Sequence, residues 1–248
     1  MMRRLYRRPK RPEPCEQKKV VFTGTITAVQ SRSKVWRYKV DNRTHTLLGY
    51  NLFFDGAVWD SAGVPQEVRT FCVAISALQQ QKLHFHIGDE VQGAAWTKQY
   101  PKLEYADYYR TSSLKKLKAA AFRPDDTAQW REALMNDDFD YARPPCGPFT
   151  EEVPAQAVYD ERGCRMLDAK LWRGRCHSCK WAAMGNVTIE YDFGVSQKHR
   201  FETFCYGPKC CPLYEMGKPR SVPEKRHGSV DDDGVLDDCI TYHRSDFD

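Results

Sequence analysis

Apolar and polar residues alternate along the first half of the chain with a period of two, the pattern of β-strands that bury one face. The clearest case is Lys19–Gln30, where Phe22, Ile26 and Ala28 share one face. Gly24 lies inside this strand and predicts a bend or bulge where the sheet curls strongly. We therefore expect the chain to begin its fold with a curved sheet.

Further short strands follow, separated by polar segments. They are expected at Val35–Val40, at Thr46–Asp55, at Arg69–Ser76, within HFHIGDEVQGAAW and within LEYADYYR. The polar residues SRSK at 31–34 are expected to form the turn between the first two strands. The segment SALQQQKL is rich in helix-forming residues and predicts a short helix. Together these patterns predict a mainly β (α+β) fold with short helices.

Five or six such strands, curled by internal glycines, resemble an OB-fold, which is a small Greek-key barrel. The resemblance covers residues 19–112 and includes a short helix before the turn-into-strand sequence Ile87-Gly88-Asp89-Glu90-Val91. It implies a ligand-binding face on the middle strands and the loops around them, used for oligonucleotides or oligosaccharides.

Aromatic and basic residues are interleaved at two places within this segment. A nucleobase can stack on an aromatic ring while cations follow the phosphate backbone, so the mixture predicts a platform for single strands. In the alternative interpretation the aromatic rings fill the barrel and only the basic residues face water. The candidate nucleic-acid-binding residues are Arg32, Lys34, Trp36, Arg37, Tyr38 and Lys39, followed by Trp96, Lys98, Tyr105, Tyr108 and Arg110.

Half of the ten cysteines are clustered in the second half of the chain. The cluster consists of Cys176, Cys179, Cys205, Cys210 and Cys211. A Cys-x-x-Cys pair directs two thiolates at one ion, and a second pair brought alongside by a hairpin completes a four-sulfur set. Pro212 favours Cys211 as the fourth ligand and leaves Cys210 as the alternative.

This cluster resembles a zinc ribbon with a longer hairpin than usual. The resemblance implies a structural Zn²⁺ ion, because four thiolates leave no coordination position open for water. A Cys-Pro ending also occurs in iron–sulfur ligation, so a [4Fe-4S] cluster is the alternative cofactor. In a third interpretation the cysteines pack in a core without metal.

The two ends of the chain carry opposite charge. Eight basic and two acidic side chains lie in residues 1–19, whereas residues 230–248 hold seven aspartates and one arginine. A basic arm can follow phosphate groups, and an acidic tail can recruit a basic protein partner; alternatively, both ends are solvated tails. The predicted organisation is a basic arm at 1–18, an OB-like barrel at 19–112, a helical extension at 113–136, a proline-rich linker at 137–157, a four-cysteine ribbon at 158–220 and an acidic tail at 221–248.

The composition and motifs favour a binding protein over an enzyme. No apolar run approaches the roughly 20 residues that span a bilayer, and no hydrophobic stretch follows the basic N-terminus, so we expect a cytoplasmic protein without a membrane partner. No phosphate-binding loop, zinc-protease motif or nucleophile elbow occurs. We expect a non-enzymatic protein that binds single-stranded DNA or RNA. The alternatives are a protein-interaction adaptor and an iron–sulfur protein that acts on nucleic acid.

Overall fold

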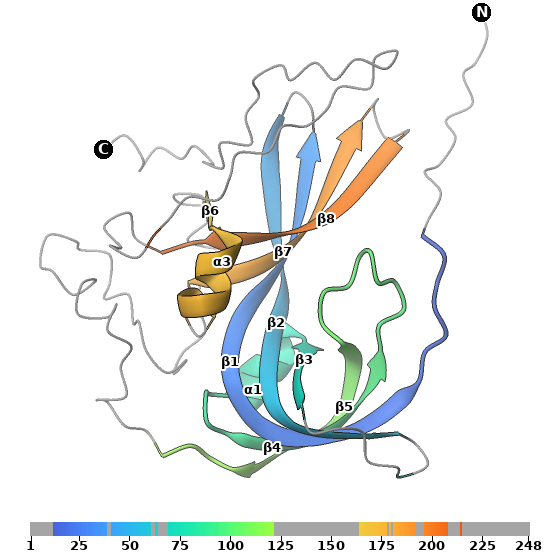
Figure 1. Ribbon diagram of the computed structural model, residues 1–248, viewed down its shortest axis with the longest axis vertical. Coiled ribbons are helices and arrows are strands. Elements are labelled where there is room, and N and C mark those ends of the chain that lie inside the picture. The colour runs from blue at the N-terminus through green and yellow to red at the C-terminus, as the bar shows by residue number, and fades with distance from the viewer. Residues whose placement is uncertain are drawn as a thin grey trace, which may run out of the picture.

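The computed structural model describes residues 12–38, 41–60, 63, 69–121, 164–177, 179, 181–191, 196–207 and 214. Its strands form one eight-stranded sheet in the order β2-β3-β5-β4-β1-β7-β8-β6 (Figure 1). The elements are β1 (Lys19–Tyr38), β2 (Asp41–Asp60), β3 (Arg69–Ile75), α1 (Ala77–Leu83), β4 (Glu90–Thr97), β5 (Tyr108–Lys118), β6 (Arg165–Met166), α3 (Ala169–Leu171), the π-helical turn η2 (Trp172–Cys176), β7 (Ala182–Tyr191) and β8 (Ser196–Cys205).

The first five strands close into a barrel, because β1 pairs with both β2 and β4. The strands β3 and β5 meet in parallel at Val73 and Tyr108, and α1 lies between β3 and β4 in the chain. This arrangement is compatible with an OB-like barrel, and the prediction of a mainly β chain with a small barrel is confirmed. The barrel interior is aromatic: the ring of Phe54 stacks on that of Phe71 with centroids 5.2 Å apart.

Two glycines that face each other allow β1 and β2 to coil around the barrel. Gly24 of β1 pairs with Gly56 of β2, and a Cβ atom on Gly56 would lie 2.2 Å from the carbonyl oxygen of Thr23. No side chain fits at that distance, so the close approach requires glycine. A register shift follows between Ile26 and Ala28, as expected for a bulged and strongly curved strand.

The strand β1 does not end where the sequence indicates a turn. Residues 31–34 continue the strand, so the predicted turn at SRSK is wrong. The backbone there pairs with β2 on one side and with β7 on the other, and buried Ser33 has a hydrogen bond to the Tyr206 hydroxyl at 3.3 Å. The polar side chains are therefore accommodated by a segment far away in the sequence.

Two other boundaries differ from the prediction. The strand β5 runs to Lys118 and pairs with β4 as far as Glu90, so residues 113–118 are strand and not helix. The segment before Glu90 is a loop in which Asp89 accepts hydrogen bonds from neighbouring backbone. The remainder of the predicted helical extension beyond residue 121 lies outside the described residues, as do 1–11, the linker at 137–157 and the acidic tail at 221–248.

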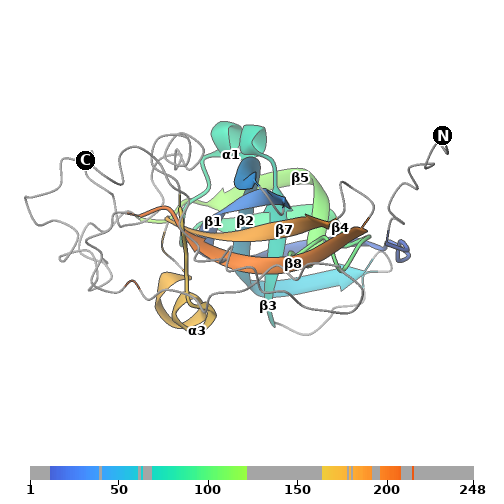
Figure 2. The same cartoon turned by 90° about the horizontal axis from the view of Figure 1, so that it is seen from above.

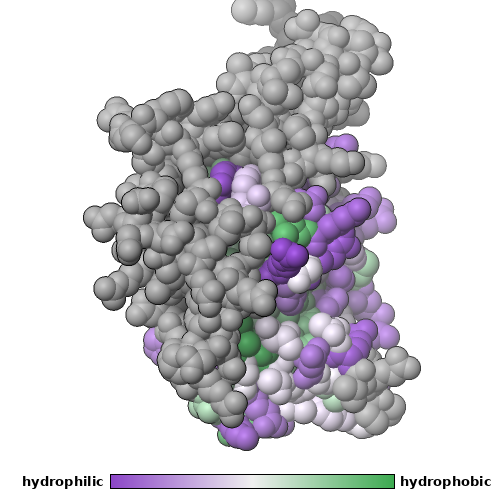
Figure 3. Space-filling view, turned by 60° about the vertical axis from the view of Figure 1, so that its left-hand side comes forward, coloured by the Kyte–Doolittle hydropathy of each residue, from purple (hydrophilic) through white to green (hydrophobic). Residues whose placement is uncertain are grey.

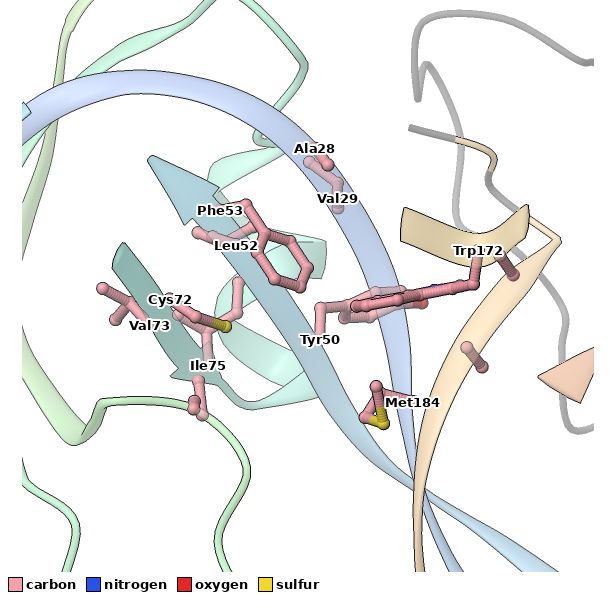
Figure 4. Packing of buried hydrophobic residues seen from close by; sticks show 14 of the residues in the cluster. Ala28, Val29, Tyr50, Leu52, Phe53, Cys72, Val73, Ile75, Trp172 and Met184 are labelled. Atoms are coloured by element: carbon pink, nitrogen blue, oxygen red, sulfur yellow. The ribbon is translucent and has the colours of Figure 1, made fainter. Parts of the chain in front are cut away.

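The cysteine-rich half extends the barrel sheet. The strand β7 pairs in parallel with β1 from Ser31 to Tyr38 and antiparallel with β8, so the β7–β8 pair continues the sheet beyond the barrel (Figures 1 and 2). The turn η2 packs on the barrel through Trp172, whose ring lies 6.1 Å from that of Phe53 (Figure 4). The two halves share one sheet and one core instead of being connected only by a linker.

Candidate nucleic-acid interface and cysteine site

The outer half of β1 carries three of the predicted residues on one face. Arg32, Lys34 and Trp36 alternate with the buried residues Ser33 and Val35, so their side chains share the less buried side of the sheet. The ammonium nitrogen of Lys34 lies 4.5 Å from the centre of the Trp36 ring. A cation and an aromatic surface are thus in direct contact.

The strands β7 and β8 continue this face sideways. Trp36 is in register with Thr188 of β7, which is in register with His199 of β8, and the Thr188 hydroxyl and His199 Nδ1 are hydrogen-bonded at 3.1 Å. Lys34 is in register with Asn186. We call these five residues, Lys34, Trp36, Asn186, Thr188 and His199, the outer strand face. Thr188 is 3 % exposed, so it positions His199, and the other four side chains are the ones that a ligand can contact.

The loop at residues 98–107 borders the outer strand face. The Asn186 side-chain amide donates a hydrogen bond to the carbonyl oxygen of Leu103. Nearby, the guanidinium carbon of Arg32 lies 5.7 Å from the centre of the Tyr109 ring at the start of β5. The structure therefore brings the first aromatic and basic cluster of the sequence beside part of the second.

The outer strand face carries the positive charge of Lys34, whereas its histidine is neutral. Burial lowers the pKa of His199, and the neighbouring Lys34 ammonium lowers it further, so the imidazole is neutral at pH 7. The neutral ring can both donate and accept a hydrogen bond. Figure 3 shows that the described residues on the face seen there are mainly hydrophilic, with small hydrophobic areas between them.

The second half of the predicted cluster divides between two places. Trp96 is 37 % exposed and pairs with Lys19, at the opposite end of β1 from Trp36. Close to it, Arg110 donates hydrogen bonds to the side chains of Gln17 and Gln99. Lys98 pairs with Asp107 at 3.8 Å. Trp96 and Arg110 therefore lie away from the outer strand face, whereas Lys98 belongs to the loop at 98–107 that borders it.

Two predicted stacking residues belong to the packing of the protein. Tyr108 is 3 % exposed, its ring contacts Phe71 at 5.9 Å and its hydroxyl accepts a hydrogen bond from Arg69. Tyr108 is thus removed from the candidate interface, because the pairing of the start of β5 with β3 buries it. Tyr105 is half-buried against Phe201, and burial raises the pKa of its hydroxyl to about 12.

Some predicted residues cannot be placed. Lys39 lies outside the described residues, and only the backbone is described for Arg37 and Tyr38. In turn, sequence reasoning missed Asn186, Thr188 and His199. Their alternation along β7 and β8 was visible, but nothing in the sequence indicated that these strands would join the edge of β1.

The cysteine turn and Cys205 lie at the same end of the β7–β8 pair. The Cys179 amide donates to the Cys176 carbonyl at 3.0 Å, which closes the tight turn of the Cys-x-x-Cys pair. The Ala182 amide then donates to the Cys179 carbonyl at 3.1 Å, and Ala182 pairs with Cys205. These backbone contacts place the Cys-x-x-Cys turn beside Cys205 at this end of the hairpin.

A buried amide from the barrel holds the cysteine turn. The side chain of Gln30 is fully buried and donates to the carbonyl oxygens of Cys176 at 2.9 Å and His177 at 2.5 Å. Its own oxygen accepts a hydrogen bond from the Trp172 indole at 3.0 Å. The conformation of the turn is therefore fixed from the barrel side.

Two donors contact the sulfur atom of Cys205. The Gly207 amide lies 3.3 Å away and the Arg165 guanidinium 3.9 Å away, contacts of the kind that orient thiolate ligands. In the described part of the chain, no group of three or more His, Cys, Asp or Glu side chains is placed to hold a metal ion. Both candidates for the fourth ligand, Cys210 and Cys211, lie outside the described residues, so the metal site stays a prediction.

Comparison of the chain with protein-family models, with curated proteins and with solved structures found no match. Among the described residues, no helix has the length and apolar character needed to cross a membrane.

Proposed function

We propose that this protein binds single-stranded nucleic acid on the outer strand face and that the cysteine module is stabilised by a thiolate-bound zinc ion. The observation that carries the binding proposal is the contact of Lys34 with Trp36, beside Arg32 and the loop at 98–107. It supplies a ring for a base and cations for the phosphates that flank it.

The position of this surface on the barrel supports the proposal. OB-folds bind oligonucleotides with the face of their second and third strands and with the loops that follow their first and fourth strands, and the present surface corresponds to these loop regions. Here the outer ends of β1 and β2 lead to the connection between these two strands. Residues 98–107 connect β4 to β5. The contact between Asn186 and Leu103 joins the two regions into one surface.

The proposal is tested by titrating a fluorescent single-stranded oligonucleotide at low salt. Trp36→Ala is expected to weaken binding about tenfold, because one stacked base contributes roughly 1–3 kcal/mol. Lys34→Ala is expected to reduce the slope of log affinity against log salt by about 0.7, the value for one phosphate contact on a single strand.

The matched control is Lys82→Ala, which removes an exposed lysine from α1 on another part of the barrel. It should leave both the affinity and the salt slope unchanged. If the unaltered protein binds no oligonucleotide at low salt, or if the lysine variants at 34 and 82 behave alike, the proposal is wrong.

A further inference from the structure

A fully buried asparagine in the middle of β2 has no hydrogen-bond partner for its side chain among the described residues. Asn51 of β2 is 0 % exposed, and among the described residues neither its amide nitrogen nor its amide oxygen has a partner. It lies between Gln30 of β1 and Ala74 of β3. Because an unpaired buried polar group costs about 1–3 kcal/mol, such an exception requires an explanation.

Arg32 reaches the same place from the neighbouring strand. It is in register with Gly49, and Asn51 lies two residues further along β2 on the same face. A Cβ atom at Gly49 would lie 2.1 Å from the Ile75 carbonyl oxygen, so no side chain separates Arg32 from Asn51 there. The Arg32 Nε atom is also buried and without a partner.

The three unpaired groups select a class of ligand. We propose that Arg32 and Asn51 form a base-reading subsite that prefers pyrimidines, an inference that rests on the proposed single-strand binding. The subsite offers donors at Arg32 Nε and Asn51 Nδ2 and an acceptor at Asn51 Oδ1. Thymine, uracil and cytosine each present two acceptors and one donor on the pairing edge, which satisfies all three groups.

Other ligands leave one of these groups unpaired. Adenine presents one donor and one acceptor on the same edge, and guanine presents two donors and one acceptor. A phosphate group has only acceptors and would face the Asn51 oxygen without a hydrogen bond. Each good side-chain pairing with a base edge contributes about 1–3 kcal/mol of discrimination, so the difference is measurable.

The Arg32 guanidinium separates the buried subsite from an exposed part of β2. The Arg32 guanidinium donates to the Leu48 carbonyl at 3.1 Å and, more weakly, to the Ile75 carbonyl at 3.5 Å, and Leu48 itself is 39 % exposed. The proposal therefore requires Arg32 to move away from these carbonyls when a base reaches Asn51. The Tyr109 ring, 5.7 Å from the guanidinium, provides an aromatic surface at this entrance.

The test compares oligo(dT), oligo(dC) and oligo(dA) of equal length with the full chain. The unaltered protein is expected to bind both pyrimidine strands more tightly than oligo(dA). Asn51→Leu should weaken pyrimidine binding about tenfold and change binding to oligo(dA) by less than twofold. Because leucine has a similar volume and removes two unpaired atoms, the variant should unfold at the same or a higher denaturant concentration.

Two further variants make the outcome specific. Gln92→Leu, the same kind of change on an exposed position of β4, should leave the preference intact. Arg32→Lys keeps the charge and removes the Nε donor, so it should reduce the preference with little change in salt slope. Equal affinity for all three strands, or a preference that survives Asn51→Leu, would overturn the subsite alone. Failure to bind any of them would overturn the proposed function with it.

Discussion

Replacing Asp89 by alanine is expected to lower the free energy of unfolding by about 2–4 kcal/mol, because it removes a buried carboxylate and leaves two backbone amide donors without their acceptor, each at a cost of about 1–3 kcal/mol. The Asp89 side chain is 1 % exposed and pairs with Lys116 at 2.7 Å. It also accepts hydrogen bonds from the backbone amides of His86 and Ala120, both at 2.8 Å. One carboxylate thus connects the start of β4 to the end of β5.

Urea denaturation measures this effect by comparing Asp89→Ala with a matched control, Asp55→Ala. Asp55 is exposed and accepts a hydrogen bond from the Thr70 hydroxyl at 3.0 Å, so its loss should cost less than about 1 kcal/mol. If Asp89→Ala and Asp55→Ala unfold at the same urea concentration, this carboxylate does not lock the barrel.

Removal of the proposed zinc ion is expected to destabilise the cysteine module. Structural zinc sites contribute about 10–16 kcal/mol of apparent binding free energy in zinc-finger peptides, so a chelator should lower the urea midpoint of the chain, whose two halves share one core. The purified protein is expected to contain zinc at one equivalent. Cys176→Ser and Cys179→Ser should lose it, since each removes one thiolate from the tight turn.

Cys15→Ser is the matched control, because Cys15 is exposed and far in sequence from the cluster. This variant should retain the metal and the urea midpoint of the unaltered protein. Cys210→Ser and Cys211→Ser, examined separately, should identify the fourth ligand. Elemental analysis that finds neither zinc nor iron would contradict the site, whereas iron in a brown preparation would replace zinc by an iron–sulfur cluster.

Local signals in the sequence predicted most of the barrel. The alternation around Phe22 and Ile26 identified β1, and the helix-forming residues of SALQQQKL identified α1. Gly24 indicated the strong curvature correctly. These predictions are correct because strand alternation, helix propensity and glycine geometry each depend on a few neighbouring residues.

Non-local pairing explains what the sequence could not show. The polar residues 31–34 read as a turn, yet β7, some 150 residues later, pairs with them and holds them in a strand. Tyr108 has the same local pattern as a surface aromatic residue, and only the parallel contact of β5 with β3 buries it. The unpaired amide of Asn51 is likewise invisible until three strands are placed around it.

The most direct measurement of the central claim is ultraviolet cross-linking of a bound oligo(dT) strand, followed by peptide mapping. Binding on the outer strand face predicts cross-links in β1 at Trp36, in β7 or β8, and at Tyr109 beside Arg32. Trp36→Ala should remove the first of these while cross-links at Tyr109 persist. Cross-links confined to other surfaces, such as α1 or the Trp96 end of the barrel, would contradict the account.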